Sequence, residues 1–266
     1  METNVEEKST PGGAQAIDRA LGLLSLVASG DGRGVPITSL TDATGLSRPT
    51  VRRMMIALMR AGFVEQDAET RAYHLGPESY IIGQMAVRQF DLLGLAMGNL
   101  LTLSAESGDS SFLSVRRGSY AVCLHREEGA YPIRTQALQA GDRHPLGIGA
   151  GSMAILAALP EDERRIVRED LAQEISQRFA SYTEEVIDKS IAIAEAQGWA
   201  LNPGQLLANS WGIGVALRAP TGDVIGAISI AALDSRMQPD RQPMLAELLL
   251  REARAIERKL EKKFAN

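Results

Sequence analysis

Two short helical segments joined by a tight turn restrict the fold of this chain more than any other feature of its sequence. Residues 38–44 are predicted to form a short helix, and Gly45 and Leu46 the turn after it. Ser47 is the predicted N-cap of a second helix, residues 48–60. This pattern is typical of a helix-turn-helix, whose second helix enters the major groove of DNA. An amphipathic helix precedes it, with apolar residues three and four positions apart at Ile17, Ala20, Leu21, Leu24 and Val27.

The second helix has one apolar side and one basic side. At about 100° per residue, the apolar arc consists of Val51, Met54, Met55 and Leu58. Arg53 and Arg60 point to the opposite side, with Arg48 and Arg52 on its flank and Thr50 near the other edge. The net charge is −5, but no acidic residue lies between positions 45 and 62, so the basic element is local. Such arginines can reach phosphates and guanine edges, although an ordinary solvated helix face is the alternative.

A β-hairpin is predicted directly after the basic helix. Two β-prone runs, residues 63–66 and 72–76, flank a polar turn at 67–71 that contains Arg71. Helix, short helix, turn, basic helix and hairpin form the order of a winged helix-turn-helix, which we place at residues 14–76. Residues 1–13 are charged, lack apolar periodicity and are predicted to be a disordered tail. The candidate DNA-binding residues are Ser47, Arg48, Thr50, Arg52, Arg53, Arg60 and Arg71.

The rest of the chain is predicted to be an α+β domain, residues 91–266, reached through a linker helix at 77–90. The linker helix and a second helix at 92–106 are candidate dimer contacts; for the second, burial within its own subunit is equally favoured. Strands are expected at 111–116, 120–127, 133–138, 213–218 and 224–231, in an antiparallel sheet. Helices are expected at 151–159 and 183–197, and at the C-terminus with apolar residues from Leu245 to Leu260. An antiparallel sheet with helices packed on it defines the α+β class.

A glycine-rich segment, HPLGIGAGSMAIL at 144–156, is the most informative part of this second domain. Glycines directly before a helix free backbone amides to face a ligand, and the helix dipole adds positive charge there, which favours a carboxylate. The alternative is a helix start packed too closely for larger side chains. The glycine spacing matches neither a dinucleotide fingerprint nor a Walker loop.

Several classes of protein are disfavoured by composition. One cysteine, Cys123, and three histidines offer too few ligands for a structural metal site, so we expect no metal and no cofactor. No apolar run of about 18 residues and no signal sequence are present, which predicts a cytoplasmic protein without membrane contact. A hydrolase that uses Ser152 with His125 or His144 is disfavoured because no G-x-S-x-G elbow occurs. We therefore expect no catalytic residues and no enzyme activity.

Four phrases of the sequence resemble the IclR family of bacterial regulators. These are ITSLTDATGLSRPTVRRMMIALMRAGFVEQD, YHLGPESYIIG, GDRHPLGIGAGSMAILAAL and GDVIGAISIAAL. The resemblance covers nearly the whole chain after residue 14, and the pairing of the DNA reader with PLGIGAGSMAILAAL is its most specific part. It implies a GAF-like sensor domain, dimers or tetramers, and small effectors that are often carboxylated or aromatic.

The resemblance also implies an effector pocket between the glycine-rich helix start and the sheet. Gly149 and Ala150 would donate amides, and Ser229 a hydroxyl. The full predicted site consists of Leu146, Ile148, Gly149, Ala150, Met153, Asn202, Gly212 and Ser229. Family members that bind small keto acids tend to have aspartate at the position of Asn202, cysteine near Gly212 and lysine at Ser152. Without those groups the pocket is expected to be roomier and to favour an aromatic or medium-chain carboxylate.

The predicted function is therefore a sequence-specific regulator that binds duplex DNA and responds to a small anionic effector. One recognition helix covers few base pairs, so a homodimer or tetramer that reads a pseudo-palindromic operator is expected. The competing hypothesis is a sensor that assembles with other proteins and uses its winged helix as a protein contact. Four arginines that face away from the apolar arc count against it.

Overall fold

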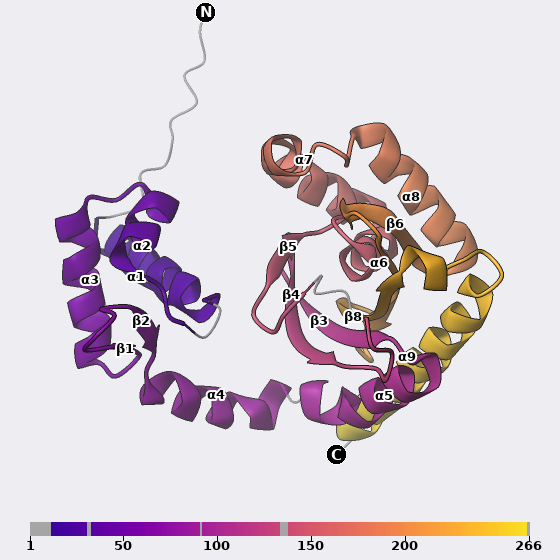
Figure 1. Cartoon of the computed structure of the whole chain (residues 1–266), viewed down its shortest axis with the longest axis horizontal. Helices are drawn as coiled ribbons and strands as arrows, with labels where there is room; N and C mark the ends of the chain where they lie inside the picture. The colour runs from indigo at the N-terminus through magenta and orange to yellow at the C-terminus, as the bar shows by residue number, and fades with distance from the viewer. Residues whose placement is uncertain (1–11, 31–32, 91, 134–137, 265–266) are drawn as a thin grey trace, which may run out of the picture. The chain divides into compact units, whose positions relative to one another are not determined.

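The computed structural model describes residues 12–30, 33–90, 92–133 and 138–264. By its internal contacts the chain divides into two units, residues 1–91 and 92–266, which are coloured from indigo to magenta and from magenta to yellow in Figure 1. Of the predicted tail, residues 1–11 lie outside the described residues, whereas residues 12 and 13 already belong to the first helix.

The first unit is built from helices and one hairpin. Its elements are α1 (Gly12–Ala28), α2 (Ile37–Thr44), α3 (Arg48–Arg60), β1 (Val64–Gln66), β2 (Tyr73–Leu75) and α4 (Pro77–Phe90). Gly45 joins α2 to α3 with a φ of 66°, a left-handed conformation that glycine adopts without strain. Leu23, Leu40, Val51 and Met55 are fully buried where the three helices meet. The predicted helix-turn-helix and hairpin are confirmed.

The second unit is a six-stranded antiparallel sheet with helices on both faces, which confirms the α+β class. Its elements are α5 (Leu92–Ser107), β3 (Ser110–Arg117), β4 (Tyr120–Glu127), β5 (Arg143–Pro145), α6 (Ala150–Ala158), α7 (Glu161–Arg178), α8 (Glu184–Gln197), β6 (Ala200–Leu207), β7 (Ser210–Arg218), β8 (Val224–Leu233), the short 3-10 helix η1 (Asp234–Arg236) and α9 (Gln242–Phe264). The strand order is β5-β4-β3-β8-β7-β6. Figure 1 shows α6 inside the curve of this sheet, with α5 and α9 side by side outside it.

Side chains of the central strand β7 alternate between the two faces of the sheet. Ile213, Val215 and Leu217 of β7 point toward α5 and α9 and share one hydrophobic core with them. The residues between them are small, and the backbone of α6 approaches so closely that a Cβ at Gly214 would lie 2.8 Å from the carbonyl of Ala150. One face of the sheet is therefore filled by large apolar side chains, while the face under α6 keeps small residues and space.

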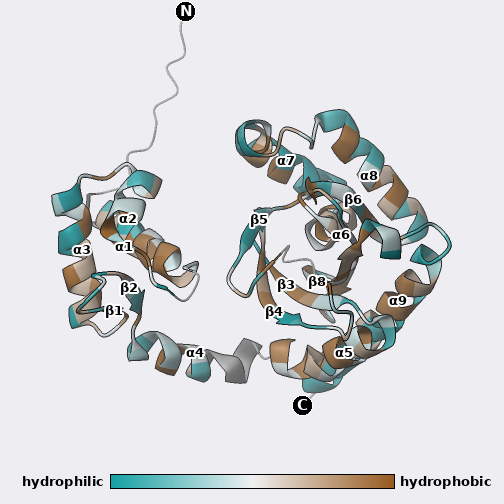
Figure 2. Ribbon diagram, viewed as in Figure 1, coloured by the Kyte–Doolittle hydropathy of each residue, from teal (hydrophilic) through white to brown (hydrophobic). Residues whose placement is uncertain are grey.

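The helix α5 buries its apolar side within its own unit. Leu92, Ala96, Leu100 and Leu103 belong to the core beneath α9, as the brown stripes on both helices in Figure 2 indicate. A buried hydrogen bond of 2.6 Å from Asn99 Nδ2 to Glu252 Oε2 on α9 adds a polar contact to this interface. The sequence left two interpretations of this helix, a dimer contact or burial within its own subunit. The second applies to these four positions.

Three elements differ from the prediction. The helix α7 is highly charged and buries only Val167, Leu171 and Ile175, so its narrow apolar stripe was not recognised in the sequence. The strand β6 contains Pro203 and Gly204 and loses its register there, which an edge strand tolerates but which hides the β pattern. The third strand of the meander was expected at 133–138. Residues 134–137 lie outside the described residues, Ile133 and Leu138 are not in a strand, and β4 pairs instead with β5.

In the part of the chain that the structure describes, no helix is long and apolar enough to cross a membrane.

Candidate functional site

The outer surface of α3 carries the predicted DNA-binding side chains. Arg48, Arg52, Arg53 and Arg60 are all exposed, while Val51, Met55 and Leu58 bury the opposite side. Within the described residues, none of these four guanidinium groups forms an ion pair. Exposed arginines without acidic partners keep their full charge available for phosphates or base edges.

Ser47 occupies the N-cap position of α3, but its side chain does not cap the helix. Its Oγ lies 2.8 Å from Oγ1 of Thr50 instead. The cause is local: Pro49 has no amide hydrogen, and the amide of Thr50 already donates to the backbone oxygen of Ser47 at 2.9 Å. The predicted N-cap position of Ser47 is therefore confirmed, and its side chain makes no capping hydrogen bond. Both hydroxyls remain at the start of the helix beside the arginines.

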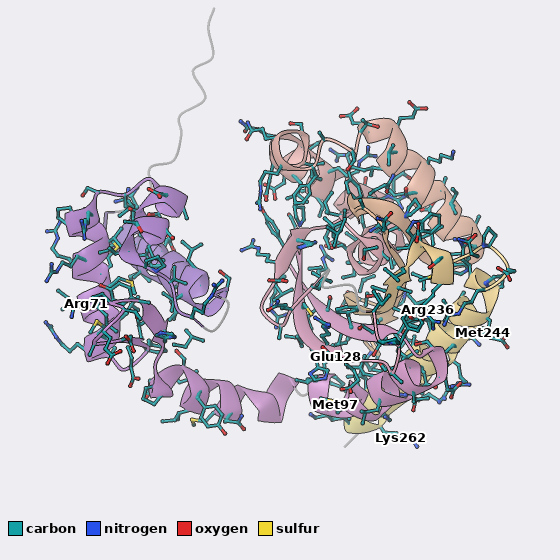
Figure 3. The ribbon with its side chains drawn as sticks, in the orientation of Figure 1. Arg71, Met97, Glu128, Arg236, Met244 and Lys262 are labelled. Atoms are coloured by element: carbon teal, nitrogen blue, oxygen red, sulfur yellow. The ribbon has the colours of Figure 1, made fainter. Side chains whose placement is uncertain are left out.

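The hairpin turn holds Arg71 at the edge of the first unit, where Figure 3 labels it. The turn is organised by Asp67, whose Oδ1 accepts hydrogen bonds from the amides of Glu69 and Thr70 and from the Thr70 hydroxyl. These bonds lower the pKa of Asp67. Arg71 itself has a φ of 59°, and its carbonyl accepts a 2.8 Å bond from Gln66 Nε2. The turn is thus ordered by local hydrogen bonds, which leave the Arg71 side chain exposed.

A cavity lies between the start of α6 and the sheet in the second unit. It offers about 540 Å³ of space free of protein atoms, part of which is open to solvent. Six predicted site residues line it: Ile148, Gly149, Ala150, Asn202, Gly212 and Ser229. The structure therefore brings residues from the glycine-rich segment and from β6, β7 and β8 to one place.

Two predicted wall residues, Leu146 and Met153, do not line the cavity. Both side chains are buried in the second hydrophobic core, which α6 shares with α7 and α8. The helix α7, absent from the sequence-based prediction, supplies Val167 and Leu171 to the core in which these two side chains are buried.

The first turn of α6 presents backbone donors to the cavity. Ala150, Gly151 and Ser152 open the helix, so their amides have no carbonyl one turn earlier to bind, and the partial positive charge of the helix end lies there. Gly149 precedes them with a φ of 84°, a conformation that other residues rarely adopt. The close approach of α6 to Gly214 fixes the height of this helix start above the sheet.

Ser152 brings an unused hydrogen-bonding group into the same place. Its side chain is 5% exposed, and its Oγ is fully buried with no hydrogen-bond partner among the described residues. Buried hydroxyls are almost always hydrogen-bonded, because an unpaired one costs about 1–3 kcal/mol. A hydroxyl that lines a cavity without a protein partner is suited to bind a ligand.

The amide of Gly149 is not free, contrary to its predicted role as a donor to the ligand. It donates to the Tyr182 hydroxyl at 3.1 Å. Tyr182 in turn lies 3.2 Å from Oδ1 of Asn202 on β6, which also accepts a bond from the Gln205 amide at 3.2 Å. The tyrosine thus connects the start of α6 to β6 behind the cavity.

The cavity has no net charge of its own near neutral pH. Among the described residues that line it, none is acidic and none is lysine or arginine. Burial, the largest cause, lowers the pKa of His144 below its ordinary 6.5, so the imidazole is neutral at pH 7. Burial likewise raises the pKa of the Cys123 thiol to about 12, so it stays protonated. Among the described lining residues, the start of α6 therefore contributes the positive potential, and the other polar groups are dipoles.

Several lining residues were missed in the sequence. Ser114, Ser210 and Trp211 join Ser152 and Ser229 on the cavity wall. The alternation of β3 and β7 could have identified Ser114, because it lies on the face opposite to Leu113 and Val115. Tyr182, between α7 and α8, carries no signal of this kind, since its contact with Gly149 spans 33 positions.

No cluster of histidine, cysteine, aspartate or glutamate that could hold a metal ion is found in the described ranges of the chain.

Two stretches of the chain match known protein families. Residues 16–68 match the IclR helix-turn-helix domain, and residues 84–258 match the family described as bacterial transcriptional regulator IclR C-terminal. Over 257 residues the chain is 30% identical to the HTH-type transcriptional repressor AllR of Klebsiella pneumoniae. That alignment covers 94% of this chain and 92% of the repressor.

Solved structures show the same fold. An IclR transcriptional regulator from Silicibacter sp. TM1040 has a TM-score of 0.77 at 24% identity, with 92% of this chain and 96% of that chain covered. An IclR homologue from Microbacterium hydrocarbonoxydans, complexed with 4-hydroxybenzoate, has a TM-score of 0.70 at 21% identity, with 93% and 99% covered.

Proposed function

Because this chain belongs to the IclR family of bacterial transcriptional regulators, we propose that its operator affinity is set by a carboxylate bound at the start of α6. Membership of this family makes the chain a transcriptional regulator with a helix-turn-helix and an effector-binding domain, and not an enzyme.

The unpartnered hydroxyl of Ser152 is the observation that carries the proposal for a carboxylate. It lies on the first turn of α6, where the amides of Ala150 and Gly151 also lack partners within the helix. The amides are donors, the hydroxyl can donate as well as accept, and the helix end favours negative charge. A carboxylate offers acceptors for these donors and gains from the helix dipole, whereas a cation would meet the positive end of the helix.

The cavity walls favour a ligand with an apolar body. Phe112, Ile148 and Leu206 line the cavity beside the polar helix start. An aromatic or medium-chain carboxylate would bury its body there while its anion meets α6. The homologue from M. hydrocarbonoxydans was solved with 4-hydroxybenzoate, so this acid is a rational first probe.

Calorimetry with pairs of acids and neutral amides tests the anion site. The probes are 4-hydroxybenzoate against 4-hydroxybenzamide and octanoate against octanamide. In the wild-type protein each acid should bind at least tenfold more tightly than its amide, because a hydrogen bond to a charged acceptor contributes about 1.5–3 kcal/mol. Equal affinity of acids and amides would place the anion elsewhere.

A pair of matched variants separates charge from size at the same position. Ala150→Asp places a negative charge beside the proposed carboxylate, and Ala150→Asn has nearly the same shape without the charge. The aspartate should abolish acid binding, and the asparagine should retain most of it. If neither variant binds the acid, the size of the side chain at position 150, and not its charge, decides binding.

The first unit is proposed to bind DNA as part of a dimer. Its helices α1 and α4 expose apolar side chains that the unit itself does not cover, notably Ile17 and Leu21 on α1 and Tyr80 and Met85 on α4. A second copy would cover them and place two α3 helices on the DNA. The operator should then be a pseudo-palindrome with half-sites about 10 base pairs, or a multiple of that, apart. A footprint with one unpaired half-site would contradict this arrangement.

A further inference from the structure

A groove separate from the cavity at the start of α6 opens at the side of the sheet where β6 begins. The strand β6 pairs with β7 only from Ala200, which lies opposite Gly214, whereas β7 continues to Arg218. On that side, residues 215–218 of β7 therefore have no neighbouring strand among the described residues. The groove follows this edge and offers about 990 Å³ of space free of protein atoms, part of which is open to solvent.

Small side chains on both sides of the sheet edge leave this space unfilled. Ala154 and Ala157 of α6 and Ala194 of α8 line the groove on one face of the sheet. Ala253 of α9 lines it on the other face. Among the described residues, none lines both this groove and the cavity at the start of α6, so the two sites are distinct.

The groove continues along the outer side of α9. Its junction consists of Trp199, Leu250 and Arg254, which line both the space at the sheet edge and a second hollow along α9. This hollow extends to Met244, which Figure 3 labels. Trp199 is only partly buried, and its Nε1 forms no hydrogen bond within the described part of the chain. An indole offers a flat apolar surface and one donor at its edge, so the junction suits a planar aromatic ring.

Two arginines at this junction are available to a ligand. Arg254 and Arg258 are exposed and lie four positions apart on α9, so they share one side of the helix. Neither forms an ion pair with another described residue. Two adjacent guanidinium groups are complementary to two adjacent anionic groups, each of which can accept charge-assisted hydrogen bonds.

The acidic residues that line the groove are bound elsewhere or lie farther along α9. Three of them have partners: Glu106 binds Arg251 at 2.7 Å, Glu195 binds Arg164 at 2.6 Å, and Glu257 accepts from the backbone amide of Arg218 at 2.8 Å. Glu247 precedes Arg254 by seven positions, about 10 Å along the helix axis. The junction therefore carries local positive charge, although the net charge of the chain is −5.

We propose that this groove is a second small-molecule site, which binds planar aromatic acids with two negative charges. The ring lies against Trp199 between the alanines, and the two anionic groups bind Arg254 and Arg258. This chemistry differs from that of the cavity at the start of α6, where one helix end is suited to one carboxylate. An extended peptide added to β7 fits less well, because the Arg218 amide already donates to Glu257.

The two tryptophans of the chain report the two sites separately. Trp199 lines the groove, Trp211 lines the cavity at the start of α6, and the sequence contains no other tryptophan. The probes are phthalate with two adjacent carboxylates, benzoate with one, and phthalamide with none. Phthalate should change the fluorescence of the Trp211→Phe protein, in which Trp199 alone reports. It should not change that of the Trp199→Phe protein.

Affinities in the Trp211→Phe protein measure the role of charge. Phthalate should bind about 5- to 10-fold more tightly than benzoate, because the second carboxylate adds a charge-assisted pair, and phthalamide should bind most weakly. Arg254→Gln and Arg258→Gln each remove one charge and keep a long polar side chain. Each should lower the affinity for phthalate about fivefold or more.

Arg117→Gln is the matched control for these variants. Arg117 is an exposed arginine at the end of β3 that forms no ion pair within the described residues and lines neither site. Its replacement changes the net charge by the same amount and should leave the affinity for phthalate unchanged. An equal loss in all three variants would mean that only the net charge of the protein attracts the acid, which would refute the site.

Three other results would overturn the proposal. A phthalate response seen only through Trp211 would place the acid in the cavity at the start of α6. Equal affinities for phthalate and benzoate at Trp199, or unchanged affinity in both Arg254→Gln and Arg258→Gln, would remove the two arginines from the site. If neither fluorescence of the Trp211→Phe protein nor calorimetry of the wild type detects phthalate, the groove is not a site for such acids.

Discussion

Replacing Ser152 with alanine should stabilise the ligand-free protein and weaken its binding of carboxylates. The Ser152 hydroxyl is buried and has no partner within the described chain, so the folded state loses the hydrogen bonds that this group makes with water in the unfolded state. Alanine keeps the Cβ and removes the polar atom. The two effects have opposite signs because the hydroxyl is unpaired only while the cavity lacks a ligand.

The magnitude follows from this single group. An unsatisfied buried hydroxyl costs about 1–3 kcal/mol, of which the lower end applies here because the cavity is partly open. For a unit of this size a gain of about 1 kcal/mol raises the melting temperature by roughly 2–4 °C. The loss of one hydrogen bond to the carboxylate should weaken the binding of 4-hydroxybenzoate by about tenfold or more.

Ser111→Ala is the matched control for this experiment. Ser111 is fully buried, but its hydroxyl donates to the Leu100 carbonyl at 3.0 Å and accepts from Ser104 at 2.9 Å. Its removal should lower stability by about 1–3 kcal/mol. Urea denaturation measures both variants, and calorimetry measures ligand affinity. If Ser152→Ala destabilises the protein as much as Ser111→Ala, the hydroxyl has a protein partner and the reasoning about the cavity is refuted.

Three further predictions concern other parts of the molecule. Gly214→Ala should destabilise the protein by about 1–3 kcal/mol and abolish carboxylate binding, because its Cβ would lie 2.8 Å from the backbone of α6. Gly98→Ala on α5, where a Cβ meets nothing within 4 Å, is the control and should raise the free energy of unfolding by about 0.5–1 kcal/mol. If urea denaturation gives the same change for both variants, α6 does not approach Gly214 this closely. Arg53→Ala should weaken specific DNA binding by about 1–3 kcal/mol, and by more than Arg60→Ala, because Arg53 lies in the first half of α3. Anisotropy titrations measure both affinities. A larger loss of affinity in Arg60→Ala would place the base contact near the end of the helix instead. Burial lowers the pKa of His144, so the unfolded chain takes up its proton first, and stability should fall as the pH drops through and below about 6.5. Urea denaturation between pH 8 and 5.5 should show a smaller loss in His144→Gln, and an identical loss would exclude this histidine as a cause.

The DNA-reading unit could be predicted from sequence almost residue by residue. Its helices are set by local signals: the apolar period of α3, a glycine at a left-handed turn, and polar residues at the hairpin. Ser47 is the N-cap residue, as predicted, and its hydroxyl makes no capping hydrogen bond because Pro49 lacks an amide hydrogen. Local rules succeed here because the unit is small and each element follows the previous one directly.

The effector cavity could be predicted only in part, because its geometry depends on distant segments. The glycine-rich start of α6 was visible, but the bond from Gly149 to Tyr182 requires two helices to return the chain to this point. The narrow apolar stripe of α7 hid a core that turns Leu146 and Met153 away from the cavity. The unpaired state of Ser152 is a property of packing, which no sequence pattern specifies.

The effect of a bound carboxylate on operator affinity tests the central claim most directly. The wild-type protein first selects an operator duplex from random sequences. Fluorescence anisotropy then measures the affinity for this duplex with and without the carboxylate that binds most tightly in calorimetry. Saturating ligand should change the dissociation constant of the wild-type protein for the operator duplex by about 5- to 150-fold. The Ala150→Asp variant should bind the same duplex with unchanged affinity at every ligand concentration. A wild type that binds the carboxylate at α6 and yet holds its operator equally well with and without it would contradict the account.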